Sequence, residues 1–234
     1  MGNRPPEEPY ERLRRLIYTN DRRTEIECKE FLNFVKPYLF TETFIEEIYC
    51  EAEYRGHSGD SDFVISAKVE SEGGDECIKA YIWEVKAPQL YVFEKDNENR
   101  LCPTIDLFKA ENQLLNYFHE NKGSTDFCKT FSTHPDDVHM GGIIIGRQDN
   151  RVNGDYSEEK KARLYGKAYN LRKEYVWNKL NIRVIIWDKI LDQLYRPGIT
   201  TRVESESEIV LPTPIVKGEY SISGFTTVTT DRKI

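Results

Sequence analysis

The apolar residues in the first half of the chain follow two different periods. Between residues 24 and 39 they recur every three or four positions, which predicts a helix with one buried face. That face consists of Cys28, Leu32, Val35 and Leu39. The period then changes to two, which predicts strands at residues 48–54, 62–68 and 78–86. Because short turns rich in Gly and Asp join these segments, we expect three neighbouring antiparallel strands.

In the second half of the chain, predicted helices alternate with apolar strands. A hairpin around residues 96–99 is followed by a helix over residues 104–120. Continuous apolar runs at 139–147 and 183–187 predict inner strands that are covered on both faces, with a long amphipathic helix at 157–179 between them. A strand–helix–strand connection implies parallel pairing through a right-handed crossover. The predicted fold is therefore α/β, with a mixed sheet flanked by helices.

The two ends of the chain have different patterns from the middle. Residues 1–20 are first proline-rich and then arginine-rich, with apolar residues at helical spacing, so we expect an ordered arm or a short helix. Residues 209–217 and 220–230 predict a C-terminal β-hairpin appendage. The predicted organisation is an arm at 1–20, a main domain at 21–196 and a β extension at 197–234.

Composition narrows the class of protein. The 234 residues carry a net charge of −7, which argues against a general electrostatic nucleic-acid binder. Basic residues do gather in regions 12–23 and 160–173, where solvated helix faces are an equally simple explanation. No apolar run approaches ~18 residues, so we expect no membrane span. Five dispersed cysteines without a Cys-x-x-Cys pair, and no apolar leader, are typical of a reduced cytoplasmic protein.

One predicted strand ends in charged residues where a buried strand should have none. In Tyr-Ile-Trp-Glu-Val-Lys at 81–86, Glu84 and Lys86 point to the same face because successive side chains of a strand alternate. Buried charges are costly unless they are paired or bind a metal. Asp62 begins the preceding strand, so we expect Asp62, Glu84 and Lys86 to form one site. Two other interpretations stay open: a simple lateral ion pair between Glu84 and Lys86, or Asp60 in place of Asp62.

These residues resemble the motif of PD-(D/E)XK nucleases. In that superfamily an αβββαβ core carries Asp at the start of the second strand and Glu-x-Lys at the end of the third, as Asp62 and Glu84-Val85-Lys86 do here. Residues 20–196 also resemble the Shedu nuclease domain of bacterial antiphage defence. The similar segments are Glu-Val-Lys-Ala-Pro at 84–88, Gln113-x-x-x-Tyr117, Ile-Ile-Ile-Gly-Arg at 143–147, Ile-Ile-Trp-Asp at 185–188, and Glu25 with Phe31-Leu32. Ser61 stands in place of the motif's proline, and Lys29 in place of a glutamine found in many relatives.

The resemblance implies a restriction-endonuclease-like core that hydrolyses phosphodiester bonds in DNA with Mg²⁺, for which Mn²⁺ would substitute. Asp62, Glu84 and the backbone carbonyl of Val85 would hold the ion. Lys86 would position or polarise the attacking water, and Gln113 would orient the lysine or the scissile phosphate. Gln113 is otherwise an ordinary exposed helix residue.

Two further residues are candidates for the same site. Glu25 would be a third acid near the metal, or else a first-turn acid that the helix dipole favours. His57, in the turn before Asp62, would assist as a base, or else be an ordinary loop histidine.

Three functions are compatible with the sequence. The leading one is a metal-dependent DNA endonuclease that acts as a Shedu-like antiphage effector and assembles as a homodimer or larger homo-oligomer. The first alternative is a module on a nuclease fold that binds nucleic acid or DNA ends without cleaving them. The second is an interaction protein in which the C-terminal strands dominate function and the Glu84 site is dispensable.

Overall fold

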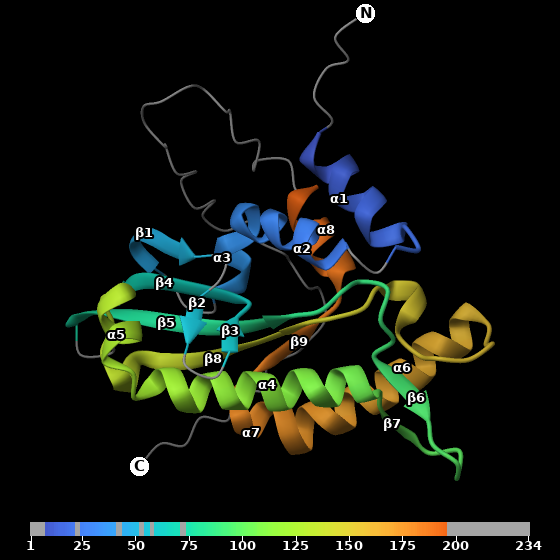
Figure 1. Ribbon diagram of the computed structural model, residues 1–234. Coiled ribbons are helices and arrows are strands. Elements are labelled where there is room, and N and C mark those ends of the chain that lie inside the picture. The colour runs from blue at the N-terminus through green and yellow to red at the C-terminus, as the bar shows by residue number, and fades with distance from the viewer. Residues whose placement is uncertain are drawn as a thin grey trace, which may run out of the picture. The chain divides into compact units, whose positions relative to one another are not determined.

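In a computed structural model of the chain, a mixed five-stranded sheet lies between two layers of helices (Figure 1). The structure describes residues 8–21, 24–40, 44–51, 54–56, 59–70 and 74–195, and for residues 44–51, 55–56 and 59–61 it describes only the backbone. In order across the sheet, the strands are β1 (Phe44–Glu51), β4 (Phe63–Glu70), β5 (Glu76–Val85), β8 (Val138–Ile144) and β9 (Arg183–Ile185). β1, β4 and β5 pair antiparallel, whereas β8 pairs in parallel with both β5 and β9. The prediction of an α/β fold with a mixed sheet flanked by helices is confirmed.

Two strand predictions need correction. Tyr54 does not continue the first strand; it belongs to a separate hairpin of β2 (Tyr54–Gly56) and β3 (Gly59–Ser61). The strand expected at 183–187 is not an inner one, because β9 ends at Ile185 and is the last strand of the described sheet. The chain leaves the sheet there since Trp187 begins helix α8 (Trp187–Leu194), in which its side chain is fully buried. A buried helix start and a buried strand give the same apolar run.

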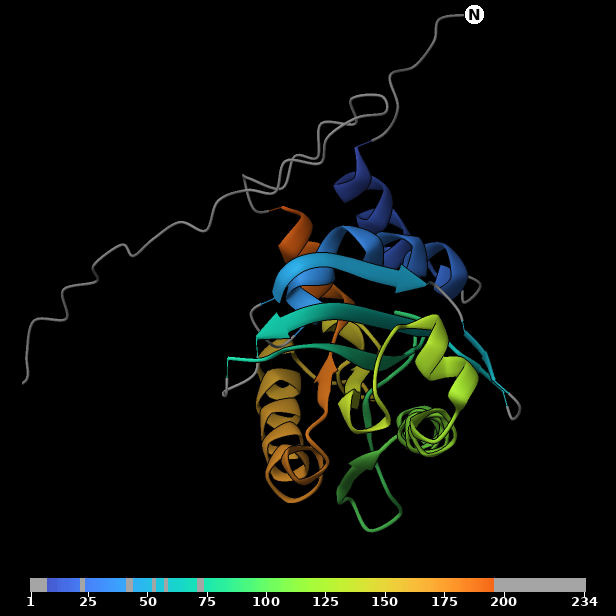
Figure 2. The same cartoon turned by 90° about the vertical axis from the view of Figure 1, so that its left-hand side faces the viewer.

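One face of the sheet is covered by α8 and by the N-terminal helices (Figures 1 and 2). These are α1 (Pro9–Tyr18), α2 (Thr24–Lys29), the 3₁₀ helix η1 (Glu30–Val35) and α3 (Lys36–Leu39). They enclose a core with Phe63, Trp83 and Val85 from the strands. All four residues of the predicted stripe, Cys28, Leu32, Val35 and Leu39, are buried in that core. The short helix expected in the arm is α1, which buries Leu13, Leu16 and Ile17.

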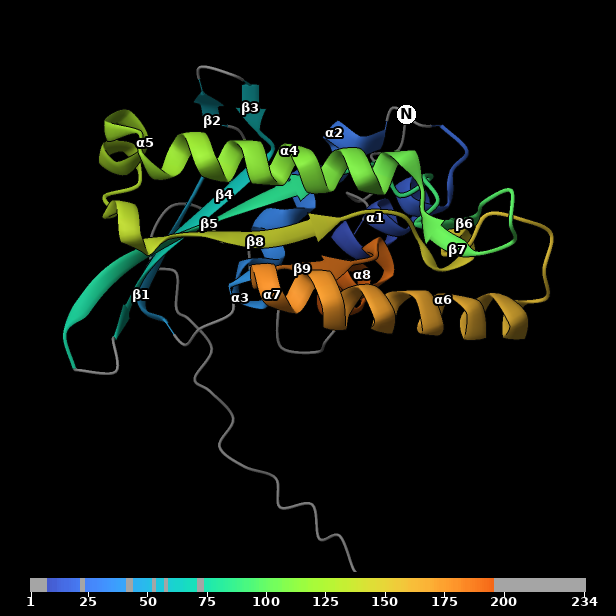
Figure 3. The same ribbon diagram turned by 90° about the horizontal axis from the view of Figure 1, so that it is seen from below.

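The other face carries the second helical layer, in which α4 and α6 both cross the sheet (Figure 3). Its members are α4 (Ile105–Lys122), α5 (Thr125–Thr130), α6 (Glu158–Arg172), the π-helical turn η4 (Lys173–Trp177) and α7 (Asn178–Leu180). The helices predicted at 104–120 and 157–179 are therefore present, the second with a π-helical interruption. The Glu111 carboxylate of α4 accepts hydrogen bonds from Arg172 and from the Trp177 indole, at 2.8 Å for the latter, and so ties α4 to α6 and η4.

The remaining described segments are short. β6 (Phe93–Lys95) and β7 (Leu101–Pro103) form the predicted hairpin around residues 96–99, and η2 (Pro135–Asp137) and η3 (Gln148–Asn150) are single 3₁₀ turns. Among the helices just described, none combines the length and the hydropathy that crossing a bilayer requires. The strands predicted at 209–217 and 220–230 lie outside the described residues.

Candidate functional site

Asp62 and Glu84 face each other at one end of the sheet. The antiparallel register pairs Phe63 with Trp83, and continuing it by one residue places Asp62 opposite Glu84. Side chains of directly opposed residues project from the same face of a sheet. Lys86 lies two residues beyond Glu84, and its Nζ contacts Oε1 of Glu84. The structure thus brings together the three side chains that the sequence placed in one site.

The end of β5 is held from several sides. The backbone N–H of Lys86 donates to the carbonyl of Ile144 at 2.8 Å, and the indole N–H of Trp187 donates to the Lys86 carbonyl at 2.7 Å. The preceding Trp83 ring packs over Gly141, where a Cβ atom would lie 2.3 Å from Trp83 Nε1. Only glycine fits at position 141 without displacing Trp83. These contacts fix the backbone on both sides of Glu84, so the carboxylate cannot easily turn towards water.

Glu84 is buried between a lysine and a second carboxylate. Its side chain is 0% exposed, Lys86 Nζ contacts its Oε1, and Asp62 lies within hydrogen-bonding reach on the other side. Burial, and then the negative charge of Asp62, raise the pKa of Glu84 to about 8 against the opposing effect of Lys86. Burial lowers the pKa of Lys86, but the carboxylates around it outweigh burial and raise the pKa overall. A cation bound beside Glu84 would offset the costs of its burial and of the neighbouring negative charge of Asp62.

Helix α2 adds two charged residues to this end of the sheet. Lys29 Nζ lies 2.6 Å from Oδ1 of Asp62 and 3.8 Å from Oε1 of Glu25, one helical turn earlier. The Glu25 carboxylate accepts a hydrogen bond from the Ala87 backbone, and burial raises its pKa although Lys86 and Lys29 lower it. α2 packs on the opposite face from α4, and the contact between Lys29 and Asp62 joins α2 to the start of β4. Glu25 lies at the border of the site, as a neighbour of Lys86.

A buried glutamine fixes α2 relative to the strand end. Gln89, in the loop after β5, accepts a hydrogen bond from Thr24 Oγ1 at 3.0 Å. Its amide nitrogen donates to the carbonyl of Leu16 at 3.0 Å, near the C-terminal end of α1. Because Thr24 is the first residue of α2, Gln89 sets where Glu25 and Lys29 lie relative to Lys86. The sequence contains one indication that Lys29 lies near the site, because Glu25 and Lys29 are four residues apart on one helix face.

Helix α4 approaches the site through Tyr117. The hydroxyl of Tyr117 is hydrogen-bonded to Gln113, and burial followed by the charges of Glu84 and Asp62 raises the pKa of Tyr117. Gln113 is partly exposed and joins the site through this tyrosine. The sequence motif contained Tyr117 without assigning it a role, whereas in the structure the charges of both carboxylates affect its pKa. His57 and the side chain of Asp60 lie outside the described residues.

Within the described ranges, no group of three or more His, Cys, Asp or Glu side chains is arranged to hold a metal ion, so a cation at this end of the sheet would have two carboxylates and a backbone carbonyl as its protein ligands. Mg²⁺ commonly takes one or two carboxylates and completes its shell with water and substrate oxygens. Val85 N–H donates to Asp62 Oδ2 at 3.0 Å, and the N–H and C=O of a strand residue point to the same side, so the Val85 carbonyl is directed towards Asp62 as well. Asp62, Glu84 and Val85 therefore offer oxygen ligands of the right kind.

Comparisons of the chain with protein-family models, with curated protein sequences and with solved structures found no match. The interpretation of the site therefore depends on its own geometry and on the motif in the sequence.

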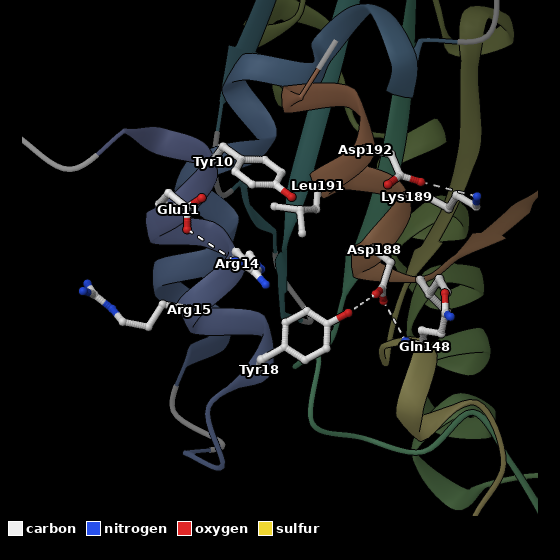
Figure 4. A pocket seen from close by; sticks show the side chains of 11 residues that line it. Tyr10, Glu11, Arg14, Arg15, Tyr18, Gln148, Asp188, Lys189, Leu191 and Asp192 are labelled. Carbon is white, nitrogen blue, oxygen red and sulfur yellow. Dashed lines mark hydrogen bonds and ion pairs between the residues drawn. The ribbon is translucent and has the colours of Figure 1, made fainter. Parts of the chain in front are cut away.

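A cleft of about 670 Å³ lies elsewhere, between α1 and α8 (Figure 4). Several of its charged groups are bonded to neighbouring residues. Asp188 accepts from the Tyr18 hydroxyl at 2.6 Å and from the Gln148 backbone N–H at 2.7 Å. Arg14 lies 3.7 Å from Glu11. Asp62, Glu84 and Lys86 are not among the lining residues, so the cleft is separate from the carboxylate site.

Proposed function

We propose that the protein is a metal-dependent DNA endonuclease of the PD-(D/E)XK type, and that it serves as a Shedu-like antiphage effector. The observation that carries the proposal is the placement of Asp62 opposite Glu84, with Lys86 on the same face and in contact with Glu84. The order of elements around them, helices α2 to α3, then β1, β4, β5, α4 and β8, agrees with the αβββαβ core of that superfamily. The defence role rests on the sequence resemblance.

Asp62, Glu84 and the Val85 carbonyl would hold Mg²⁺ or Mn²⁺. Such an ion supplies positive charge to the phosphoryl oxygens and lowers the pKa of a bound water. Lys86 would hydrogen-bond the attacking water or a non-bridging phosphate oxygen, for which its side chain, 19% exposed, is accessible from solvent. Because Trp187 and Ile144 anchor its backbone, the ammonium group reaches the phosphate from a fixed position. Tyr117 would keep Gln113 oriented on the α4 side.

The test is nicking of supercoiled plasmid by the full chain in Mg²⁺ or Mn²⁺, with a chelator as the negative control. We expect Lys86→Ala to reduce cleavage by about 10²- to 10⁴-fold, the usual contribution of a positioned proton-transfer group. Lys68→Ala is the matched control, because Lys68 on β4 is partly exposed and forms an ion pair with Glu76 on β5. Lys68→Ala should cleave like the parent, and thermal melting should show both variants folded. A folded Lys86→Ala protein that nicks as fast as the parent would contradict the proposal.

One observation favours the non-cleaving alternative. Each of the two central carboxylates is already in contact with an ammonium group, Asp62 with Lys29 and Glu84 with Lys86. A fold that binds DNA without cutting would keep such neutralised pairs. The same plasmid assay separates the two functions, since a binding module retards DNA in a gel and leaves it supercoiled in every metal tried.

A further inference from the structure

Lys29 is a lysine in an unusual place. Its side chain is only 9% exposed, and its Nζ lies 2.6 Å from Asp62 Oδ1, a short charge-assisted contact. The other oxygen of Asp62 accepts from Val85 N–H at 3.0 Å. Both oxygens of the carboxylate that would bind a divalent cation are therefore occupied by donors from the chain itself.

A metal ion and the Lys29 ammonium group cannot share this position. A divalent cation binds a carboxylate oxygen at about 2.1 Å, so an ammonium group on the same oxygen would lie next to it with no solvent between them. Like charges at such a separation in a buried site repel strongly. Binding of the cation thus requires Lys29 Nζ to leave Asp62 Oδ1.

Glu25 provides a second acceptor for the displaced ammonium group. Its Oε1 is 3.8 Å from Lys29 Nζ, four residues earlier on the same helix. The Ala87 backbone holds the Glu25 carboxylate in place, and the Thr24 contact with Gln89 holds the helix. A lysine has a flexible four-carbon stem, so rotation of its side chain suffices to exchange partners and α2 need not move.

We infer that Lys29 is an internal counter-cation, which occupies the metal position at Asp62 in the metal-free protein and transfers to Glu25 when a divalent cation binds. The inference rests on the proposed metal site and adds a determinant of its affinity. Lys29 lowers the affinity of the site for the divalent cation, because the cation can bind only after the Lys29–Asp62 pair has been broken. Lys86 makes the corresponding contact with Glu84, but the proposed function assigns it to the reaction itself.

The experiment is calorimetric titration of Mn²⁺ into the full chain without DNA. We expect Lys29→Gln to bind Mn²⁺ roughly tenfold more tightly than the parent, because a charge-assisted hydrogen bond no longer has to be broken. Lys29→Arg keeps the positive charge and should restore the parent affinity. Glu25→Gln, which removes the second acceptor, should weaken binding. Lys68→Gln, which removes a positive charge outside the site, should have no effect.

The possible results test the role of Lys29 separately from the existence of the metal site. Equal or weaker Mn²⁺ binding by Lys29→Gln, with binding to the parent intact, would overturn the role of Lys29 and leave the proposed nuclease site standing. If neither the parent nor Lys29→Gln binds Mn²⁺, the metal site fails, and this inference with it. Thermal melting of Lys29→Gln and Lys29→Arg shows whether each variant is folded, and Lys29→Arg provides a charged variant should the neutral one unfold.

Discussion

Glu84 on β5 and Glu111 on α4 are both buried glutamates in contact with a basic side chain, yet their surroundings differ. Glu111 is 7% exposed and accepts from Arg172 through both of its oxygens, and from the Trp177 indole at 2.8 Å. Glu84 is 0% exposed, and its basic partner Lys86 contacts one of its oxygens, Oε1. A second carboxylate, Asp62, lies beside Glu84 and raises its pKa further.

Under the proposed function, the difference separates a structural carboxylate, Glu111, from one that would bind a metal ion, Glu84. A buried charge that serves the fold is fully hydrogen-bonded, as Glu111 is, because each unmet acceptor costs free energy. A carboxylate kept buried next to another acid is a cost to the fold. Carboxylates with a pKa perturbed in this way cluster at sites of ligand binding and catalysis.

The largest effect on stability is expected at the structural carboxylate. Glu111→Ala leaves Arg172 and the Trp177 N–H without their acceptor between α4 and α6, and should lower the free energy of unfolding by about 3 kcal/mol. Cleavage per folded molecule should stay unchanged. Urea denaturation measures the stability, with Glu76→Ala as the control for loss of a more exposed ion pair. A loss below about 1 kcal/mol would remove the contrast between the two glutamates.

A smaller effect of opposite sign is expected at Glu84. Burial and the charge of Asp62 raise the pKa of Glu84 to about 8 in the folded protein, whereas in the unfolded chain it is near 4.5. The folded state therefore binds more protons between these values, and this contribution to stability is present at low pH and is lost as the pH rises through 8. Glu84→Gln removes the cost in free energy of burying an ionised carboxylate at high pH, but it also leaves Lys86 without its partner.

We expect Glu84→Gln to unfold like the parent at pH 5 and to be more stable by about 2 kcal/mol at pH 8.5, measured in a chelator. The same variant should have lost cleavage activity. A stability difference that is constant between pH 5 and pH 8.5 would show that Glu84 is not protonated in the folded state, and that its burial carries no electrostatic cost.

The central site was predictable because it depends on short-range rules. Alternation along one strand places Glu84 and Lys86 on one face, and antiparallel neighbours joined by a short connection bring Asp62 opposite Glu84. The same rules yield the antiparallel strands and the parallel crossover strands of the sheet. They need no knowledge of how the helices pack.

The missed features depend on how helices lie on the sheet. The Lys29–Asp62 contact joins α2 to the start of β4, and the Glu111–Arg172–Trp177 cluster joins α4 to α6 and η4. Trp187 reaches the Lys86 carbonyl from 101 residues away in sequence. No local pattern encodes these distances. The prediction of an inner strand at 183–187 was wrong for a related reason, since an apolar run does not reveal whether the chain turns into a helix at Trp187.

The most direct measurement of the central claim is a crystal structure of the full chain soaked with Mn²⁺, with data collected at the manganese absorption edge. The account predicts an anomalous peak about 2.2 Å from oxygens of Asp62, Glu84 and the Val85 carbonyl, with Lys29 turned towards Glu25. An occupied Mn²⁺ site elsewhere, with Lys29 still on Asp62 and Glu84 still in contact with Lys86 alone, would contradict it.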